Sequence, residues 1–342
     1  MPLTIASYSF DDPSYACARL RVVEPVRALG KAVRLLFGVV PRGAGHIVRG
    51  DIAAEADVLL VQRVFPCAQT APLLETLFAS GKPVIYDTDD DWTSLPASHP
   101  FAPDMAVRLP HILDTVRRAS LVTVSTPPLA ATFGAHASRV RVVPNLLPGT
   151  LWRPYPPPDQ PVVAVGLAAT PSHQADWAPL ETALARLTDQ LPGPTRWVFY
   201  GCPPTPGLFP RATVLPFTTD YVAYAARLPR LGLAIGLAPL ADTPFNRAKS
   251  PIKWMEFANC GLAGIFADLP PYQAVVEQER TGLLVGPAPE DWCEALTRLV
   301  RDAPFRRRLA EQAGETVRTK HRLDTKAECY LDAWETALGG RS

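Results

Sequence analysis

The sequence predicts an α/β protein made of two domains, each built on a doubly wound parallel sheet. Its 342 residues are enough for two domains of ordinary size. Short runs of Val, Ile and Leu alternate with amphipathic segments, which is typical of parallel strands covered by helices on both faces. The stretch 152–161 holds five prolines in ten residues and interrupts this alternation, so we expect it to be the linker between the domains.

The order of apolar runs predicts the elements of each domain. In the first domain, residues 1–151, we expect strands at 3–10, 32–40, 57–64, 82–87, 121–126 and 139–145, with helices between them. In the second domain, residues 162–322, we expect strands at 162–169, 196–201, 213–217, 231–240, 263–268 and 281–286. Residues 323–342 predict a helix with Leu331, Trp334 and Leu338 on one face. That face packs on its own domain or crosses back to the first domain, and we expect the crossing.

Composition and charge narrow the class of protein. A net charge of +1 creates no field that would attract nucleic acid, so we expect no nucleic-acid partner. The six cysteines form no CxxC pair, which is typical of reduced thiols in a cytoplasmic protein. We see no signal peptide and no membrane-spanning segment. The basic cluster 306–308 either forms a solvated helix face or is weakly attracted to anionic lipid. The attraction would place the protein peripherally at the inner membrane face.

Three cations crowd the start of a predicted helix within 245–261. Arg247, Lys249 and Lys253 lie where the helix dipole already concentrates positive charge. Ser250 is a suitable N-cap and Pro251 a suitable first helical residue. An anion bound at this helix N-terminus would compensate the cations, whereas a solvated face that binds nothing is the alternative.

An acidic run follows the predicted strand 82–87. Asp87, Asp89 and Asp90 stand with Asp91 close enough to repel one another, which favours a general base facing an acceptor. The same carboxylates could bind a metal or form a solvated turn. Arginines offer a second set of candidates, which either bind an acidic ligand or pair with surface carboxylates. Arg19 and Arg21 form an Arg-x-Arg pair early in the first predicted helix, and Arg63 lies at another predicted strand end.

Several motifs together resemble one enzyme family. A Lys-Ser-x-x-Lys-x-x-Glu stretch occupies 249–256, and a strand, a Pro-Tyr turn and "TGLLV" follow it. Upstream, 168–177 is similar to a Thr/Ser-x-x-His-x-x-Asp loop, and 86–92, "YDTDDDW", is similar to an acidic motif at a strand end. These motifs resemble those of the GT-B glycosyltransferases, close to glycosyltransferase family four (group 1), over most of the chain.

The resemblance implies a GT-B fold of two Rossmann-like domains with an interdomain cleft, the first on the acceptor side and the second binding a nucleotide sugar. It implies a metal-independent hexosyltransferase of glycan biosynthesis that uses a nucleoside diphosphate sugar as co-substrate and no other cofactor. The acceptor is a hydroxyl of a glycan, a lipid-linked glycan, a protein or a small molecule. The implied donor-binding residues are Thr170, His173, Asn246, Lys249, Ser250, Lys253, Glu256 (on the ribose) and Tyr272. The catalytic candidates are Asp87, Asp89, Asp90, His173 and Lys249, and the acceptor-side candidates are Arg19, Arg21 and Arg63.

One departure from the family pattern keeps other functions open. Many members carry a glutamate eight residues before the ribose-binding one, and this chain has Ala248 there. A nucleotide-sugar-binding partner subunit that has lost transfer is therefore a second hypothesis. A sugar-nucleotide epimerase of GT-B architecture, which needs no acceptor, is a third.

Overall fold

The computed structural model describes residues 1–43 and 45–339, which group into two compact units. Unit 1 comprises Met1–Leu146, Ala248–Ser250 and the chain from Leu323 onward. Unit 2 comprises Leu147–Arg247 and Pro251–Arg322. The proline-rich stretch 152–161 therefore lies inside unit 2, and the chain joins unit 1 for three residues just before the helix that carries Glu256.

A six-stranded parallel sheet forms the centre of unit 1. Its strands lie in the order β2 (Val33–Phe37), β1 (Leu3–Tyr8), β5 (Val58–Gln62), β6 (Val84–Thr88), β7 (Leu121–Val124) and β8 (Val140–Val142). Every neighbouring pair is parallel, as continuous runs of apolar residues predict. The six expected strands are all present, with ends that differ by a few residues.

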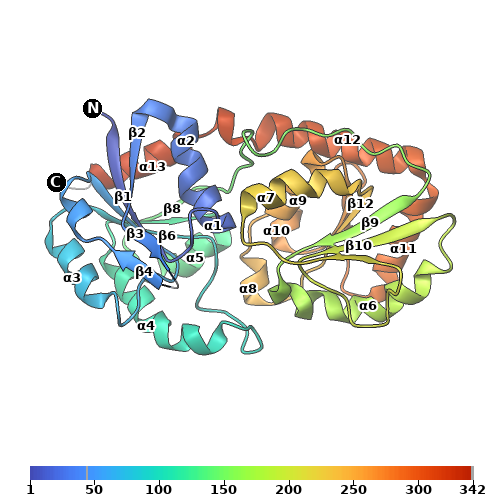
Figure 1. The fold of residues 1–342 in the computed structure, drawn as a ribbon, viewed down its shortest axis with the longest axis horizontal. Helices are drawn as coiled ribbons and strands as arrows, with labels where there is room; N and C mark the ends of the chain where they lie inside the picture. The colour runs from blue at the N-terminus through green and yellow to red at the C-terminus, as the bar shows by residue number, and fades with distance from the viewer. Residues whose placement is uncertain (44, 340–342) are drawn as a thin grey trace. The chain divides into compact units, whose positions relative to one another are not determined.

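Alternate residues of these strands enter two separate apolar cores. Leu59 and Val61 contribute to one core, while Val58 and Leu60 contribute to the other, because successive side chains point to opposite faces of a sheet. The second core is covered by helix α13 (Glu328–Leu338), whose Trp334 is 2% exposed (Figure 1). The buried face of α13 is centred on Trp334, whereas Leu338 at its end is 38% exposed, so the expectation for Leu338 is wrong.

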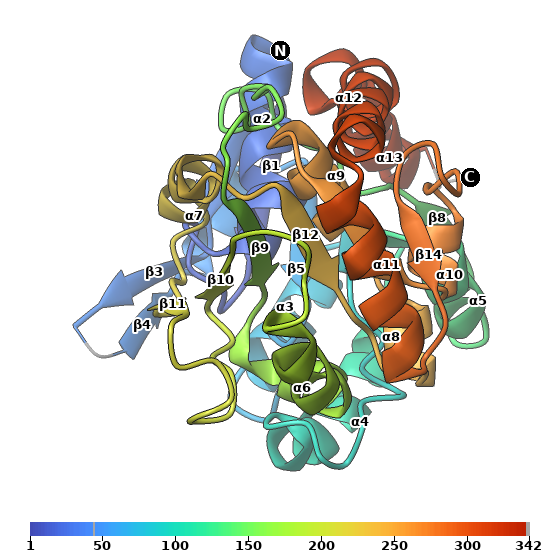
Figure 2. The ribbon, with the colours of Figure 1, turned by 90° about the vertical axis from the view of Figure 1, so that its right-hand side faces the viewer.

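The remaining elements of unit 1 cover the sheet or extend from it. The helices are α1 (Ala16–Ala18), a π-helix (Arg19–Val23), α2 (Glu24–Leu29), α3 (Ala71–Ala79), α4 (Ala102–Arg118) and α5 (Pro127–Gly134). The expected strand 32–40 is divided at Gly38, where a β-carbon would lie 2.4 Å from the ring of Tyr8. Beyond Gly38 the chain forms an antiparallel hairpin of β3 (Val39–Arg42) and β4 (Gly45–Val48), visible in Figure 2, which the sequence did not predict.

Unit 2 contains a second six-stranded parallel sheet. Its order is β11 (Thr213–Leu215), β10 (Thr195–Tyr200), β9 (Val163–Ala168), β12 (Ile235–Ala238), β13 (Ala263–Ala267) and β14 (Leu283–Val285). Numbered from β9, this is the order 3-2-1-4-5-6 of doubly wound nucleotide-binding folds. From β9 the chain adds β10 and β11 on one side, and from β12 onward it adds strands on the other side. The boundary between β9 and β12 is therefore the topological switch point of the sheet.

Helices surround the sheet of unit 2, and Figure 2 shows α6 and α11 beside its strands. They are α6 (Gln174–Thr188), α7 (Tyr221–Arg227), α8 (Pro244–Arg247), α9 (Ile252–Asn259), α10 (Pro270–Gln273), α11 (Pro289–Arg301) and α12 (Ala303–Lys320). Three tryptophans, Trp177, Trp254 and Trp292, are almost completely buried on α6, α9 and α11. Large buried aromatic side chains of this kind contribute strongly to packing energy.

The basic cluster on α12 has partners within unit 2. Arg306 donates to the carbonyl of Leu299 at the end of α11, and burial lowers its pKa. Arg307 pairs with Asp159, and Arg308 lies over the ring of Phe305. These contacts favour a structural role over attraction to lipid. Among the described residues, none of the helices combines the length and the apolar composition that crossing a bilayer requires.

Candidate functional site

The switch point of unit 2 brings two of the expected donor-site residues together. His173 lies in the loop after β9, just before α6, and Asn246 lies on α8, in the connection after β12. In open parallel sheets, ligands bind outside the carboxyl ends of the strands at such a switch point. The first turns of the helices that follow also offer backbone N–H groups to an anion. The topology alone therefore marks this end of the sheet as the candidate site.

Asp176, on the first turn of α6, links the two loops. Its Oδ2 lies 2.7 Å from Nδ1 of His173. Its Oδ1 accepts hydrogen bonds from the backbone N–H of Ala241 at 2.8 Å and from the side-chain amide of Asn246 at 2.7 Å. The Asp176 side chain is only 8% exposed, so these bonds satisfy a carboxylate that is largely removed from water.

Two further expected donor residues contribute hydroxyl groups in unit 2. The hydroxyl of Thr170, two residues after the end of β9, is 2.6 Å from that of Ser172. Tyr272 on α10 is buried, with its ring 4.9 Å from that of Phe266. Burial and, next, the charge of Asp176 raise the pKa of Tyr272 well above its usual range. The Tyr272 phenol therefore stays protonated.

Glu256, the expected ribose-binding residue, lies buried in a polar cluster of unit 2. Its two carboxylate oxygens accept hydrogen bonds from Tyr221 at 3.0 Å and Tyr224 at 2.9 Å. The ammonium of Lys253 lies 2.6 Å from Glu256 and 2.9 Å from the Tyr224 hydroxyl. Burial and, next, the Glu256 charge raise the pKa of both tyrosines well above their usual range, so both remain donors. The Glu256 side chain is only 3% exposed.

These contacts correct the charge argument made from the sequence. Lys253 is compensated by Glu256, three residues further along α9. Arg247 is compensated by Asp242, with two hydrogen bonds of 2.5 and 2.7 Å. Two of the three cations therefore have carboxylate partners within the chain, and their charge does not by itself require an anionic ligand.

The start of α9 also differs from the expectation. The helix begins at Ile252, with Pro251 in the capping position, so Ser250 is not the N-cap. Ser250 instead accepts a hydrogen bond from the side chain of Asn145, 3.1 Å away within unit 1. Its neighbour Lys249 belongs to unit 1 as well and is partly exposed.

Ala248 is buried in an apolar core of unit 1. It is 3% exposed, and its backbone carbonyl accepts a hydrogen bond from the hydroxyl of Thr126 at 2.8 Å. Carboxylates are rarely buried without a partner because removing the charge from water is costly. The position at which the resemblance to the GT-B glycosyltransferases would place a glutamate is therefore part of the packing in this chain.

Two expected active-site residues of unit 1 form a buried ion pair. Arg21, on the π-helix, donates from Nη2 and Nε to the two oxygens of Asp87 at 2.6 and 3.2 Å. Asp87 also accepts a hydrogen bond from the Thr123 hydroxyl at 2.7 Å. Arg21 donates a further hydrogen bond from Nη1 to the side-chain oxygen of Asn145 at 3.1 Å. The exposed fractions of the two side chains are 0% and 5%. Because these two groups pair with each other, the ion pair disfavours the expected roles of Asp87 toward an acceptor and of Arg21 toward an acidic ligand, and both roles stay predictions.

Arg63 stands at the centre of the remaining acidic residues. It follows β5 with φ of 50°, in the left-handed region that non-glycine residues rarely adopt. Its guanidinium donates to Asp11 at 2.6 Å and to Asp90 at 2.8 Å, and its Nε lies 3.5 Å from Asp89. Asp11 was not among the expected site residues. Arg19, the third expected arginine, pairs with Glu24 at 2.7 Å.

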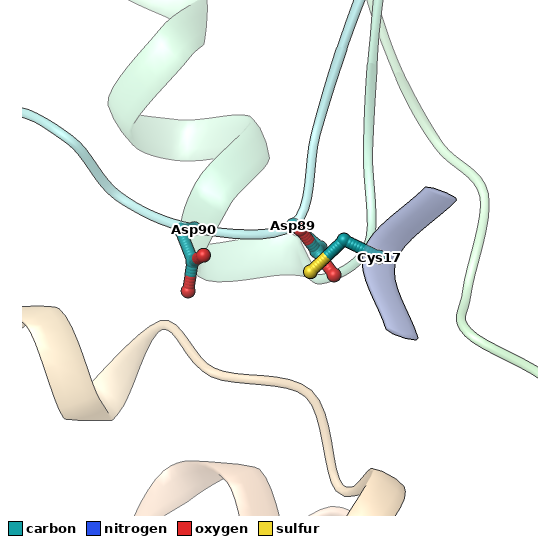
Figure 3. Close-up of side chains that lie close together, drawn as sticks. All are labelled: Cys17, Asp89 and Asp90. Atoms are coloured by element: carbon teal, nitrogen blue, oxygen red, sulfur yellow. The ribbon is translucent and has the colours of Figure 1, made fainter. Parts of the chain in front are cut away.

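The geometry of unit 1 includes one group of potential metal ligands. Cys17, Asp89 and Asp90 each offer an atom, and these atoms lie within 4.8 Å of one another. Figure 3 shows the Cys17 sulfur beside an Asp89 oxygen. Metal binding requires a thiolate, but burial raises the pKa of Cys17 well above its usual range. The Arg63 guanidinium already neutralises part of the carboxylate charge, so the arrangement fits an ion-pair network better than a metal site.

Sequence reasoning missed the partners that organise the donor-side residues. Asp176 was available in the Thr/Ser-x-x-His-x-x-Asp pattern, three residues after His173, where side chains of a helix start can meet. Tyr221 and Tyr224 are also three residues apart on one helix face. Their link to Glu256, 32 residues or more further along the chain, carried no local signal.

Comparison with solved structures identifies the fold. The chain matches sucrose-phosphate synthase from Thermosynechococcus elongatus with a TM-score of 0.67, at 16% identity over 97% of this chain and 98% of that one. The fold is that of the GT-B glycosyltransferases. It matches Anabaena HepE in complex with UDP-glucose with a TM-score of 0.67, at 15% identity over 98% and 100% of the two chains. A glycosyltransferase from Rickettsia africae matches with a TM-score of 0.66, at 12% identity over the whole of both chains. No protein-family model and no curated protein matches the sequence.

Proposed function

We propose that the chain is a glycosyltransferase that moves a hexose from a nucleoside diphosphate sugar to a hydroxyl acceptor. The observation that carries this proposal is the cluster of polar side chains at the switch point of unit 2, in which Asp176 joins His173 to Asn246. A matching structure, HepE, contains UDP-glucose, which makes that compound the first donor to test. Figure 1 locates α6 and α8, which flank this end of the sheet.

The donor would use three kinds of group. The first-turn N–H groups of α9 and the ammonium of Lys249 bind the diphosphate, because both favour negative charge. Glu256 binds a ribose hydroxyl. A carboxylate has about four lone-pair positions, and three hydrogen bonds are already made, so the ribose hydroxyl takes the remaining position or replaces a tyrosine hydroxyl.

Catalysis would come mainly from stabilising the departing diphosphate. Preorganised donors aimed at developing negative charge are usually the largest single contribution to catalysis. On the acceptor side, Asp89 and Asp90 remain the candidates for a general base after Asp87 is assigned to Arg21. Asp90 is held by a 2.8 Å hydrogen bond from Arg63, whereas Asp89 lies 3.5 Å from the Arg63 Nε. Asp89 is therefore the better base of the two.

Donor binding gives a direct test of this function. At 100 times its dissociation constant, UDP-glucose is expected to stabilise the native protein by about 2.7 kcal/mol, which raises the melting temperature. The Glu256→Gln variant should lose most of this rise, because the amide cannot accept from both tyrosines and Lys253 as the carboxylate does. The matched control is Glu311→Gln, on the exposed face of α12. Equal shifts in all three proteins would remove Glu256 from the donor site.

Chelation tests whether transfer needs a metal. We expect EDTA to leave UDP release from UDP-glucose within about twofold of the untreated rate, because Lys249 and the α9 N-terminus supply positive charge to the diphosphate. A loss of activity that added Mg²⁺ or Mn²⁺ restores would contradict this expectation. It would make Cys17, Asp89 and Asp90 the candidate metal ligands.

The buried Ala248 favours one alternative function. A chain without the glutamate of its relatives at this position could bind the nucleotide sugar and serve as a partner subunit without transferring it. A glycosyltransferase and a binding subunit both show the thermal shift with UDP-glucose. Only the glycosyltransferase releases UDP when glycan or lipid-linked acceptors are added, so an assay for UDP distinguishes the two.

A further inference from the structure

We propose that Asp176 is a positioning residue that acts through His173: it holds the proton of Nδ1, so that Nε2 is the nitrogen that meets the nucleotide sugar. This inference rests on the proposed function for its ligand, but its structural half can be tested without any ligand. It assigns a role to a residue that lies one helical turn from His173 and that is not itself proposed to bind the diphosphate.

The hydrogen bond decides which ring nitrogen carries the proton. A neutral imidazole has one N–H donor and one acceptor, and a carboxylate can only accept. Because Oδ2 of Asp176 lies 2.7 Å from Nδ1 of His173, Nδ1 must be the donor. The identity of the protonated nitrogen is set by the partner of the other nitrogen in this way at many functional histidines.

The position of the Asp176 carboxylate is itself fixed by both loops of the switch point. Oδ1 accepts from the Ala241 N–H and from the Asn246 amide, whose nitrogen also donates to the Ala241 carbonyl at 2.9 Å. Three bonds to two separate segments leave the carboxylate little freedom to rotate. Its place in the first turn of α6 also suits the positive end of that helix.

This arrangement predicts a specific effect of Asp176→Asn. The asparagine oxygen can still accept from Ala241 and Asn246, so we expect the fold and the link between the loops to be kept. Its amide would then face Nδ1 of His173 as a donor, which forces Nδ1 to become the acceptor and moves the ring proton to Nε2. The nitrogen that meets the ligand would change from acceptor to donor in the neutral ring.

Nuclear magnetic resonance of the imidazole nitrogens tests the structural half on the full chain. The six histidines are resolved by their long-range proton–nitrogen correlations, and His173 is assigned by its loss in His173→Ala. At pH 8 we expect a protonated Nδ1 in the wild type and an unprotonated Nδ1 in Asp176→Asn. An unprotonated Nδ1 in the wild type, or an unchanged spectrum in the variant, would overturn the proposal.

A double-mutant cycle tests the functional half, with UDP-glucose as the titrated ligand. We expect Asp176→Asn to weaken binding about tenfold in the wild-type background and less than about twofold in the His173→Ala background, because the two residues act as a unit. An equal loss in both backgrounds would show a purely structural role and would refute the proposal. If the wild type does not bind UDP-glucose while the tautomer change is observed, the proposed function fails and the positioning by Asp176 stands.

Discussion

Arg21→Ala is expected to lower the free energy of unfolding by about 3–5 kcal/mol, because it leaves the Asp87 carboxylate buried without its charge partner. The pair is completely enclosed, with side-chain exposures of 0% and 5%. Burial alone would lower the pKa of Arg21, but Asp87 raises it above its usual range, which shows how closely the two charges are coupled. Denaturation with urea, followed by circular dichroism, measures the change.

Two further variants make this result specific. Arg117→Ala removes an exposed arginine that lies 3.6 Å from Asp114, and we expect a loss below about 1 kcal/mol. The double variant Arg21→Met, Asp87→Leu removes both charges and should recover much of the lost stability, since a buried ion pair replaced by apolar groups is often neutral. A stability of Arg21→Ala close to that of the wild type would show that the pair does not organise unit 1.

Lys249→Ala is expected to lower kcat by about 10²–10³, the loss seen when one preorganised donor to a developing negative charge is removed. The KM for UDP-glucose should change much less, because the charge on the diphosphate grows as the bond to the sugar breaks. Release of UDP from UDP-glucose, with acceptor present, gives both constants.

Lys249→Arg and Lys320→Ala are the controls for that measurement. Arginine keeps the positive charge and should retain part of the activity, although its planar group does not reproduce the geometry of an ammonium. Lys320 is an exposed residue at the end of α12, so Lys320→Ala should leave kcat unchanged. Equal kcat values for Lys249→Ala and the wild type would exclude Lys249 from stabilising the leaving group.

The sequence was sufficient to predict both sheets. Buried parallel strands require continuous apolar runs, and these are visible in segments such as 57–64 and 162–169. The hairpin of β3 and β4 was missed because the interruption at Gly38 depends on the ring of Tyr8, 30 residues earlier, which no local pattern shows. The helix start near Ser250 was placed one residue early, a difference that capping preferences alone cannot resolve.

The candidate site was harder to predict because charges were read without their partners. The four carboxylates of 87–91 looked alike in the sequence, but the structure assigns Asp87 to Arg21, 66 residues away, and Asp90 to Arg63, 27 residues away. Arg247 and Lys253 have no evident partner in the sequence, but the structure pairs them with Asp242 and Glu256. Pairing across the fold is a tertiary property, whereas residue spacing reports only neighbours on the same element.

Hydrogen exchange, measured by mass spectrometry with and without UDP-glucose, tests the central claim most directly. A nucleoside diphosphate sugar bound at the switch point of unit 2 should slow exchange in the loop after β9, within 168–177, and in the segment 241–256 that leads into α9. Loss of this protection in Glu256→Gln would connect it to the ribose. Protection that appears only elsewhere in the chain, or none at saturating UDP-glucose, would contradict the account.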